Sequence, residues 1–271
     1  MGTFSILGID EIALTKGHGD FVASITARGV KGELYPLAVL PDRTKQTIEA
    51  WLKTIPTAIQ RQIHTVCTDM WVGYVNAVRA VLPHAAIVID RFHVAEHSHE
   101  DADSVRKVEL KRLKQELPKD EHKTLKQTLW PFRKRAAELT PEEQTRLDAL
   151  FAHSPALKAA YTFRQQLTTI FDTARSKAEG IRRIKAWRRR VEASGVTCYA
   201  PFLKLLDNWL DLIANYFRHR HRSGFVEGLN NKLKVLKRRC FGIYHLGHLF
   251  QRITLDMHGY RRFSPWQTAQ H

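Results

Sequence analysis

Hydrophobic positions in the first third of the chain alternate between a strand period and a helix period. Glycine and lysine separate the first three apolar runs, which is typical of strands joined by tight turns. Two later segments repeat every three to four residues, as helices do, and each ends before a proline. The predicted strands span residues 4–9, 20–26, 33–40, 63–67 and 85–89, and the predicted helices 44–55 and 74–82.

The resulting order, β-β-β-α-β-α-β, is a hairpin-rich start followed by parallel crossovers. It is the order of a ribonuclease-H-like core, an α/β fold on a mixed sheet. From Phe92 to about Tyr216 the strand pattern stops and five or six helices are expected, with further helices over 224–239 and 245–257. We therefore expect three parts: a first part of the core at 1–104, a large all-helical insertion at 105–216, and the C-terminal helices of the core at 217–271.

Three of the predicted strands end at aspartates, namely Asp10, Asp69 and Asp90. In open α/β sheets, ligand groups gather at the carboxyl ends of strands. Taken alone, Asp10 or Asp69 is explained by a turn or a helix cap. Two such acids side by side repel each other, and a bound cation is the common remedy. With Glu227 they form a set of carboxylates suited to divalent metals that drive phosphodiester cleavage.

The helix predicted around Glu227 has two different faces. One carries an apolar stripe of Leu229, Leu233, Leu236 and Cys240. The other carries Glu227, Asn231, Lys234 and Arg238. That face is either an ordinary solvated one, with an acid favoured in the first turn, or a metal ligand followed by cations that hold phosphates. The sequence leaves both interpretations open.

Histidines cluster directly after Asp90. His93 and His97 lie four residues apart and could bind zinc, but no partner ligands flank them. We favour a different role, in which Asp90 and His93 hydrogen-bond within the site and steady the second carboxylate, Asp69.

The net charge of +16 is concentrated in one part of the chain. Residues 1–90 hold 8 basic and 8 acidic residues, so the whole excess lies in 91–271. Such an excess is typical of nucleic-acid binding proteins. No lipidation motif, signal peptide or apolar run near 18 residues indicates a membrane. Three scattered cysteines support neither a disulfide framework nor a zinc ribbon, so a reducing cytoplasm is expected.

Two basic segments are the candidates for DNA backbone contacts. Trp130, Trp187 and Trp209 lie in helical segments beside basic residues, and core packing is the first explanation for each. Base stacking by Trp187 is a weaker alternative. The candidate DNA-binding residues are Arg182, Arg183, Lys185, Arg188, Arg189 and Arg190 in the first segment, and Lys232, Lys234, Lys237, Arg238 and Arg239 in the second.

Four motifs together resemble one known family. They are Ile-Asp-Glu at 9–11, Thr-Asp-Met-Trp at 68–71, Asp-Arg-Phe-His-Val at 90–94 and Glu-Gly-Leu-Asn-Asn-Lys-Leu-Lys-Val-Leu-Lys-Arg-Arg at 227–239. From residue 4 to 255 the chain resembles the ISL-three family of bacterial insertion-sequence transposases. The resemblance implies a ribonuclease-H-like catalytic domain, with a helical insertion between the second and third acids.

The resemblance also implies roles for individual residues. Asp10, Asp69 and Glu227 would form a DDE triad binding two Mg²⁺ or Mn²⁺ ions, and Asp90 and His93 fit the Asp-x-x-His signature of related groups. Asn231 is an accessory residue beside the glutamate. The partners implied are DNA and a second copy of the chain on paired DNA ends, at the nucleoid in a bacterial cytoplasm, with no membrane and no small-molecule cofactor.

The chain departs from the family at its start. Members usually carry an N-terminal zinc-binding and helix-turn-helix region, whereas here one strand precedes Asp10 without a Cys/His cluster. A truncated copy, a split reading frame or a catalytic fragment is expected. Two rivals to a transposase remain: a DNA-binding remnant without catalysis, and a ribonuclease-H-like nuclease or resolvase without strand transfer.

Overall fold

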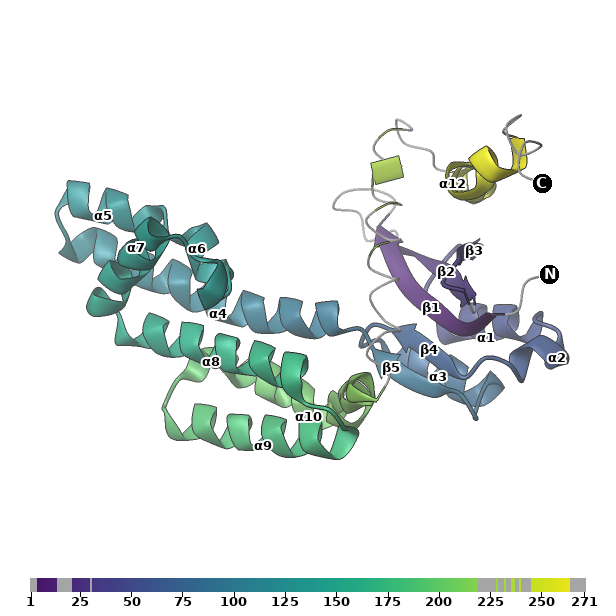
Figure 1. Ribbon diagram of the computed structural model, residues 1–271, viewed down its shortest axis with the longest axis horizontal. Coiled ribbons are helices and arrows are strands. Elements are labelled where there is room, and N and C mark those ends of the chain that lie inside the picture. Colours follow the sequence, from purple (N-terminus) through teal and green to yellow (C-terminus); the bar gives the residue numbers. More distant parts are fainter. Residues whose placement is uncertain are drawn as a thin grey trace. The chain divides into compact units, whose positions relative to one another are not determined.

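Two compact units make up the chain in the computed structural model (Figure 1). The sheet unit comprises Met1–Phe92 and His219–His271, and the helical unit comprises His93–Arg218. Residues 93–104, which the sequence pattern assigned to the core, thus belong to the helical unit. The structure describes residues 4–13, 21–29, 31–218, 228, 232, 235, 236, 239 and 245–263.

The sheet unit contains a five-stranded mixed sheet in the order β3-β2-β1-β4-β5. The predicted order β-β-β-α-β-α-β is found, with one additional short helix, α2. The strands are β1 (Phe4–Ala13), β2 (Phe21–Gly29), β3 (Leu34–Leu40), β4 (Thr65–Thr68) and β5 (Ala86–Ile89). The helices are α1 (Lys45–Lys53), α2 (Thr57–Gln60), α3 (Val72–Val81) and α12 (Leu246–Phe263).

Strand β1 is the centre of this sheet and pairs differently on its two sides. It runs antiparallel to β2 as far as Ala13, but its parallel pairing with β4 stops at Ile9 opposite Thr68. Asp10 therefore lies inside β1, and not at its end as the apolar pattern predicted. The reason is that β2 continues to pair with β1 beyond the point where β4 ends.

The alternation of side chains along β1 separates two faces of the sheet. Ile12 and its partner Val22 pack against Leu249 and Ile253 of α12. Asp10 is two residues from Ile12, so it belongs to the face that α12 covers. Glu11 belongs to the opposite face, where its side chain meets Arg43, just before α1.

The helical unit contains seven α-helices and no strand among its described residues, where five or six helices were expected. Proline or serine at the starts of several helices explains their boundaries: Ser154 and Ser176 each accept a backbone hydrogen bond from the first turn that follows. The helices are α4 (Arg91–Glu116, which begins in the sheet unit), α5 (Lys119–Lys126), α6 (Leu129–Arg133), α7 (Pro141–His153), α8 (Pro155–Thr173), α9 (Lys177–Ala193) and α10 (Ala200–Ala214).

The core of the helical unit is aromatic. Trp187 of α9 is fully buried, contacts Tyr199 and Phe202 edge-on, and donates its indole N–H to the Phe163 carbonyl at 2.9 Å. Core packing is thus confirmed for Trp187, and base stacking by it is wrong. Core packing, which was also expected for Trp130, is wrong there, because Trp130 is 68% exposed.

The C-terminal part of the chain is described in fewer positions. The predicted helix over 224–239 lies mostly outside the described residues, although Lys232 and Leu236 within it are helical and Leu236 is buried. The last predicted helix corresponds to α12. Across the described ranges, we find no helix with the length and apolar content needed to cross a membrane.

Candidate active site

Three acids lie in register on three neighbouring parallel strands. β1 pairs Ile9 with Thr68 of β4, and β4 pairs Thr68 with Ile89 of β5. One residue further along each chain come Asp10, Asp69 and Asp90. The Asp90 N–H still donates to the Thr68 carbonyl at 2.9 Å, so the alignment extends past the last strand pair. The sheet thereby brings the three aspartates predicted at strand ends, Asp10, Asp69 and Asp90, to one edge.

The surroundings of two of these acids are buried. Asp10 is 6% exposed and its carboxylate accepts the Glu11 N–H at 2.7 Å, while the Ser24 hydroxyl donates to its carbonyl oxygen. Asp90 is 4% exposed and accepts the Phe92 N–H at 3.1 Å, as an N-cap of α4 does. Main-chain N–H groups therefore help to orient both carboxylates.

Tyr74 of α3 shows how closely the acids are grouped. Its side chain is fully buried, and its hydroxyl has no hydrogen-bond partner among the described residues. Burial raises the pKa of Tyr74, and the negative charges of Asp69, Glu11 and Asp10 raise it further. One buried hydroxyl thus lies within electrostatic reach of three carboxylates, and it stays protonated near neutral pH.

A second group of residues borders the acids on the face opposite α12. The Arg43 guanidinium pairs with Glu11 and lies 4.7 Å from the ring centre of Phe21 and 4.2 Å from that of Trp71. The Trp71 indole N–H donates to the Arg43 carbonyl at 3.1 Å. Sequence reasoning missed Arg43, because no motif lies near it, and Tyr74, because the helical pattern after the 68–71 motif treats it only as a core position. Glu11 and Trp71 were inside recognised motifs, but had been given no role.

The histidines after Asp90 do not gather into a metal site. His93 lies with its Nδ1 3.7 Å from the Glu96 carboxylate. In the described ranges, no group of three or more His, Cys, Asp or Glu side chains is arranged to hold a metal ion.

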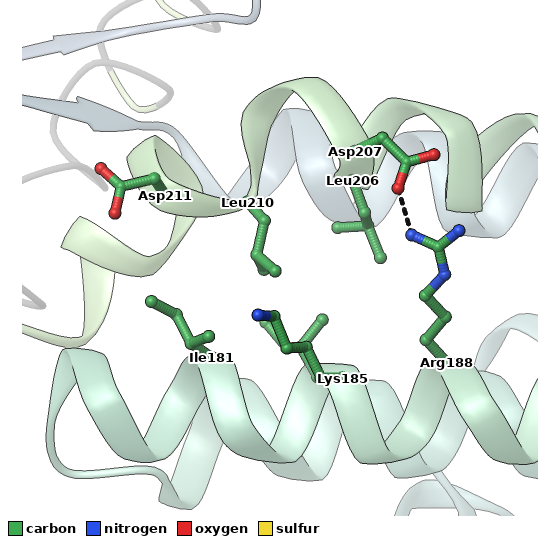
Figure 2. Close-up of a pocket in the computed structure, with 8 residues that line it drawn as sticks. Ile181, Lys185, Arg188, Leu206, Asp207, Leu210 and Asp211 are labelled. Atoms are coloured by element: carbon green, nitrogen blue, oxygen red, sulfur yellow. Dashed lines mark hydrogen bonds and ion pairs between the residues drawn. The ribbon is translucent and has the colours of Figure 1, made fainter.

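Some cations of the basic helix α9 pair with neighbouring side chains. Arg188 pairs with Glu192 and with Asp207 of α10, and Arg183 pairs with Glu179. A pocket of about 360 Å³ lies between α9 and α10, and Lys185 is one of its lining residues. Figure 2 shows the Arg188–Asp207 pair at one end of it. Arg190 donates to the Gln166 side chain at 3.3 Å.

Lys177 at the start of α9 pairs with Asp211 of α10 at 2.7 Å. The other cations of α9 form what we call the basic stripe: Arg182, Lys185 and Arg189. Spacings of three and four residues place them on one side of the helix, opposite the buried Ile184, Trp187 and Val191. All three are exposed, and within the described part of the chain no ion pair involves them.

Several predicted site residues cannot be placed. Glu227, Asn231, Lys234, Lys237 and Arg238 lie outside the described residues. Of the same segment, Lys232 pairs with Asp256 of α12 at 2.9 Å, and Arg239 is exposed. The structure therefore brings together Asp10, Asp69 and Asp90 and gives no position for the third predicted acid.

The chemistry of the acid edge fits a divalent cation. Carboxylate oxygens are the ligands that Mg²⁺ prefers, and the strand register supplies two of them from Asp10 and Asp69. One buried hydroxyl within electrostatic reach of both, Tyr74 Oη, has no hydrogen-bond partner in the described part of the chain. Water molecules on a hydrated cation would meet both needs, charge compensation and hydrogen bonding.

Two comparisons with known proteins indicate the family of the chain. A family model for DDE transposases of the ISL-three type, described as "Transposase", matches residues 7–253. The chain is also 29% identical over 257 residues to the transposase for insertion sequence element IS1001 of Bordetella parapertussis. That alignment covers 94% of this chain and 62% of the relative, so the chain spans less than two thirds of the relative's length.

Proposed function

Because the chain belongs to the ISL-three family of DDE transposases, we propose that it carries the catalytic domain that cuts and joins DNA at insertion-sequence ends. The observation that carries the proposal is the register that aligns Asp10 and Asp69 on neighbouring parallel strands. The strand order is β3-β2-β1-β4-β5, in which β2 runs antiparallel to both β1 and β3, and β4 and β5 run parallel to β1. This topology supports a ribonuclease-H-like core.

In this proposal Asp10, Asp69 and Glu227 hold two Mg²⁺ or Mn²⁺ ions. When bound, such ions activate water or a 3′-hydroxyl and stabilise the leaving oxygen. The main-chain N–H of Glu11 orients the Asp10 carboxylate, and the buried surroundings exclude bulk water from it. Asp90 holds the start of α4 next to Asp69, with His93 one turn along, which is how both would act as accessory residues.

DNA is the proposed partner. The basic stripe supplies cations that carry no ion pair to any described residue, and we infer that their charge is available to phosphates. Arg183 and Arg188 contribute less, since neighbouring carboxylates already neutralise them. Lys234, Lys237, Arg238 and Arg239 would hold the strand beside Glu227. Lys232 would contribute less, because Asp256 already pairs with it. Pairs of DNA ends would require a second copy of the chain, acting at the nucleoid in the bacterial cytoplasm.

Two other functions need to be separated from this one. A DNA-binding remnant would keep the basic stripe but lack cleavage, and the presence of all three acids argues against it. A ribonuclease-H-like nuclease or resolvase would cleave but not join. A product in which donor ends are covalently attached to a target separates the transposase from the nuclease.

The test is nicking of supercoiled plasmid with Mg²⁺ or Mn²⁺ by the wild type and by Asp69→Asn. Loss of a metal ligand removes several kcal/mol of transition-state stabilisation, so we expect nicking to fall about a hundredfold or more. Glu49→Gln is the matched control, because Glu49 is an acid of the same unit whose partners are Lys45 and Lys53 of α1.

The outcomes separate a catalytic protein from a DNA-binding remnant, and the joined product described above then separates the transposase from the nuclease. Metal-dependent nicking that is lost in Asp69→Asn and kept in Glu49→Gln supports a catalytic carboxylate site. Salt-sensitive DNA binding without nicking by any variant favours the remnant. Nicking that Asp69→Asn retains would remove Asp69 from the site.

A further inference from the structure

Arg43 touches both segments that carry the proposed metal ligands, although no motif includes it. Its ion-pair partner Glu11 follows Asp10 on β1, and its stacking partner Trp71 comes two residues after Asp69. Its contacts reach across 32 residues to Glu11 and 28 residues to Trp71. All these residues belong to the sheet unit.

The main chain around Arg43 is held firmly on both sides. The Asp42 carboxylate accepts hydrogen bonds from the Thr44 N–H at 2.8 Å and from the Thr44 hydroxyl at 2.7 Å. Thr44 in turn is the N-cap of α1, accepting the Thr47 N–H. The backbone at Arg43 is therefore fixed by the hydrogen bonds of its two neighbours, which limits the positions that the Arg43 side chain can reach.

The guanidinium is held from three directions at once. Phe21 and Trp71 lie near it with ring centres at 4.7 and 4.2 Å, and the Glu11 carboxylate pairs with it. A flat guanidinium suits simultaneous contact with two ring faces, which is a feature of arginine that lysine does not reproduce. The exposed Trp71 is fixed twice, because its indole N–H also donates to the Arg43 carbonyl.

Gly73 makes this position of Trp71 possible. A Cβ at residue 73 would lie 2.7 Å from the Trp71 indole nitrogen, closer than real contacts allow, and 3.5 Å from the Arg43 carbonyl oxygen. Any side chain there would displace the indole from Arg43. The sequence Asp-Met-Trp-Val-Gly thus encodes a tryptophan that folds back over the start of α3.

We propose that Arg43 is a positioning residue: by tying Glu11 to Trp71, it fixes the segments that carry Asp10 and Asp69 in the spacing that binds a divalent cation. The inference rests on the proposed function. Two neighbouring carboxylates repel each other and tend to separate, and a bridge between their segments opposes that separation without itself touching the ion. Pairing with Arg43 also keeps Glu11 on the opposite face, where it does not compete for the ion.

The test measures Mn²⁺ binding to the full chain by titration calorimetry, with Mn²⁺ alone as the probe. Supporting residues around metal ligands contribute about ten- to a hundredfold in affinity, and we expect a loss of that size in Arg43→Met. Arg43→Lys keeps the ion pair but loses the planar stacking, so its loss should be smaller. Gly73→Ala, which displaces Trp71 without changing any charge, should also weaken binding.

Arg79→Met is the matched control, because it removes an exposed arginine from α3 of the same unit and should leave Mn²⁺ affinity unchanged. Plasmid nicking gives a second measurement: in the Arg43 variants the Mn²⁺ concentration for half-maximal rate should rise, with the rate recovered at saturating Mn²⁺. Thermal unfolding checks each variant, and if Arg43→Met does not fold, Arg43→Lys and Gly73→Ala decide.

Failure of this inference and failure of the proposed function give different results. If Asp69→Asn loses Mn²⁺ binding while the Arg43 and Gly73 variants bind like the wild type, the positioning role is overturned and the metal site stands. If Asp69→Asn binds Mn²⁺ as tightly as the wild type, the metal site itself is overturned, and the role of Arg43 with it.

Discussion

The acids that join helices in the helical unit and the acids at the edge of the sheet have different surroundings. In the helical unit, acids on different helices lie within ion-pair distance of arginine or lysine. Examples are Asp103 with Arg106 and Arg133, Glu143 with Lys134, and Asp207 with Arg188. At the edge of the sheet, by contrast, the register aligns Asp10, Asp69 and Asp90, and main-chain N–H groups help to orient two of them.

This difference indicates what each set of charges is for. A paired acid in the helical unit joins helices and so contributes to folding. In the proposed site, acids grouped at the sheet edge would repel each other, and such repulsion is a usual cost of a functional site. Changing a paired acid of the helical unit should therefore cost stability, and changing Asp10 or Asp69 at the sheet edge should cost activity.

The largest stability effect is expected at Asp103. Its carboxylate is 5% exposed, accepts Arg106 Nε at 2.7 Å and Arg133 at 3.1 Å, and is the main partner of a buried arginine. Breaking such a pair leaves a buried charge uncompensated, so Asp103→Asn should lower the free energy of unfolding by about 3–5 kcal/mol. Urea unfolding measures this change.

Two controls sharpen this prediction. Asp148→Asn changes an exposed acid of α7 and should have little effect on unfolding. Asp69→Asn should keep or raise stability in metal-free buffer, because it removes one of two neighbouring like charges. Equal destabilisation by Asp103→Asn and Asp69→Asn would contradict the contrast between the units.

A second prediction concerns the pH dependence of the helical unit. Burial, and then the charges of Arg164 and Arg133, lower the pKa of His99 from 6.5 to about 4. Between these values the unfolded chain binds a proton that the folded chain does not, so stability falls as the pH drops from 6.5 to about 4. The slope for one such group approaches about 1.4 kcal/mol per pH unit.

The measurement is urea unfolding at several pH values for the wild type and His99→Gln. Carboxylates also titrate near pH 4, so the difference between the two proteins isolates the contribution of His99. His84→Gln, at an exposed histidine of the sheet unit, should preserve the wild-type slope. If His99→Gln also preserves it, His99 does not lose its proton on folding.

Most of the sheet could be predicted from the sequence, because strand alternation and turn residues are local signals. The grouping of Asp10 with Asp69 followed from strand ends in parallel crossovers. Arg43 could not be predicted, since its contacts with Glu11 and Trp71 depend on how distant segments meet. Which helical side chains are exposed to solvent could not be predicted from the sequence either.

Two tryptophans show why helical exposure escapes sequence reasoning. Trp130 and Trp187 both lie in helices beside basic residues, yet one is 68% exposed and the other is fully buried. The helical period identifies a face, but the neighbouring helices decide whether that face is covered. The same holds for the cations of α9, where Asp207 of α10 neutralises Arg188 and leaves the basic stripe for solvent.

A third prediction uses this division within α9. Replacing all three residues of the basic stripe by alanine should make the dependence of log affinity on log salt shallower by about 0.9 for each phosphate that the protein no longer neutralises. Arg188→Ala should weaken folding, because it leaves Asp207 and Glu192 without their cation, and should leave the salt slope nearly unchanged. Fluorescence anisotropy with labelled duplex DNA at several salt concentrations measures both. An equal change of slope in Arg188→Ala would remove the distinction between paired and available cations.

The smallest expected effect compares two buried tyrosines, one in each unit. The Tyr199 hydroxyl donates to the Ala160 carbonyl at 2.7 Å, so Tyr199→Phe should lower the free energy of unfolding by about 1–3 kcal/mol. The Tyr74 hydroxyl has no partner among the described residues, so Tyr74→Phe in metal-free buffer should leave stability unchanged or raise it by about 1 kcal/mol.

Thermal unfolding of both variants, with and without Mn²⁺, completes this comparison. If the Tyr74 hydroxyl is left for a hydrated cation, Mn²⁺ should stabilise the wild type more than Tyr74→Phe, and should affect the wild type and Tyr199→Phe equally. A loss of stability in Tyr74→Phe as large as that in Tyr199→Phe would mean that the hydroxyl is already satisfied without metal. The sheet edge would then be as fully bonded as the helical core, and the strain expected of grouped acids would have to lie in the carboxylates alone.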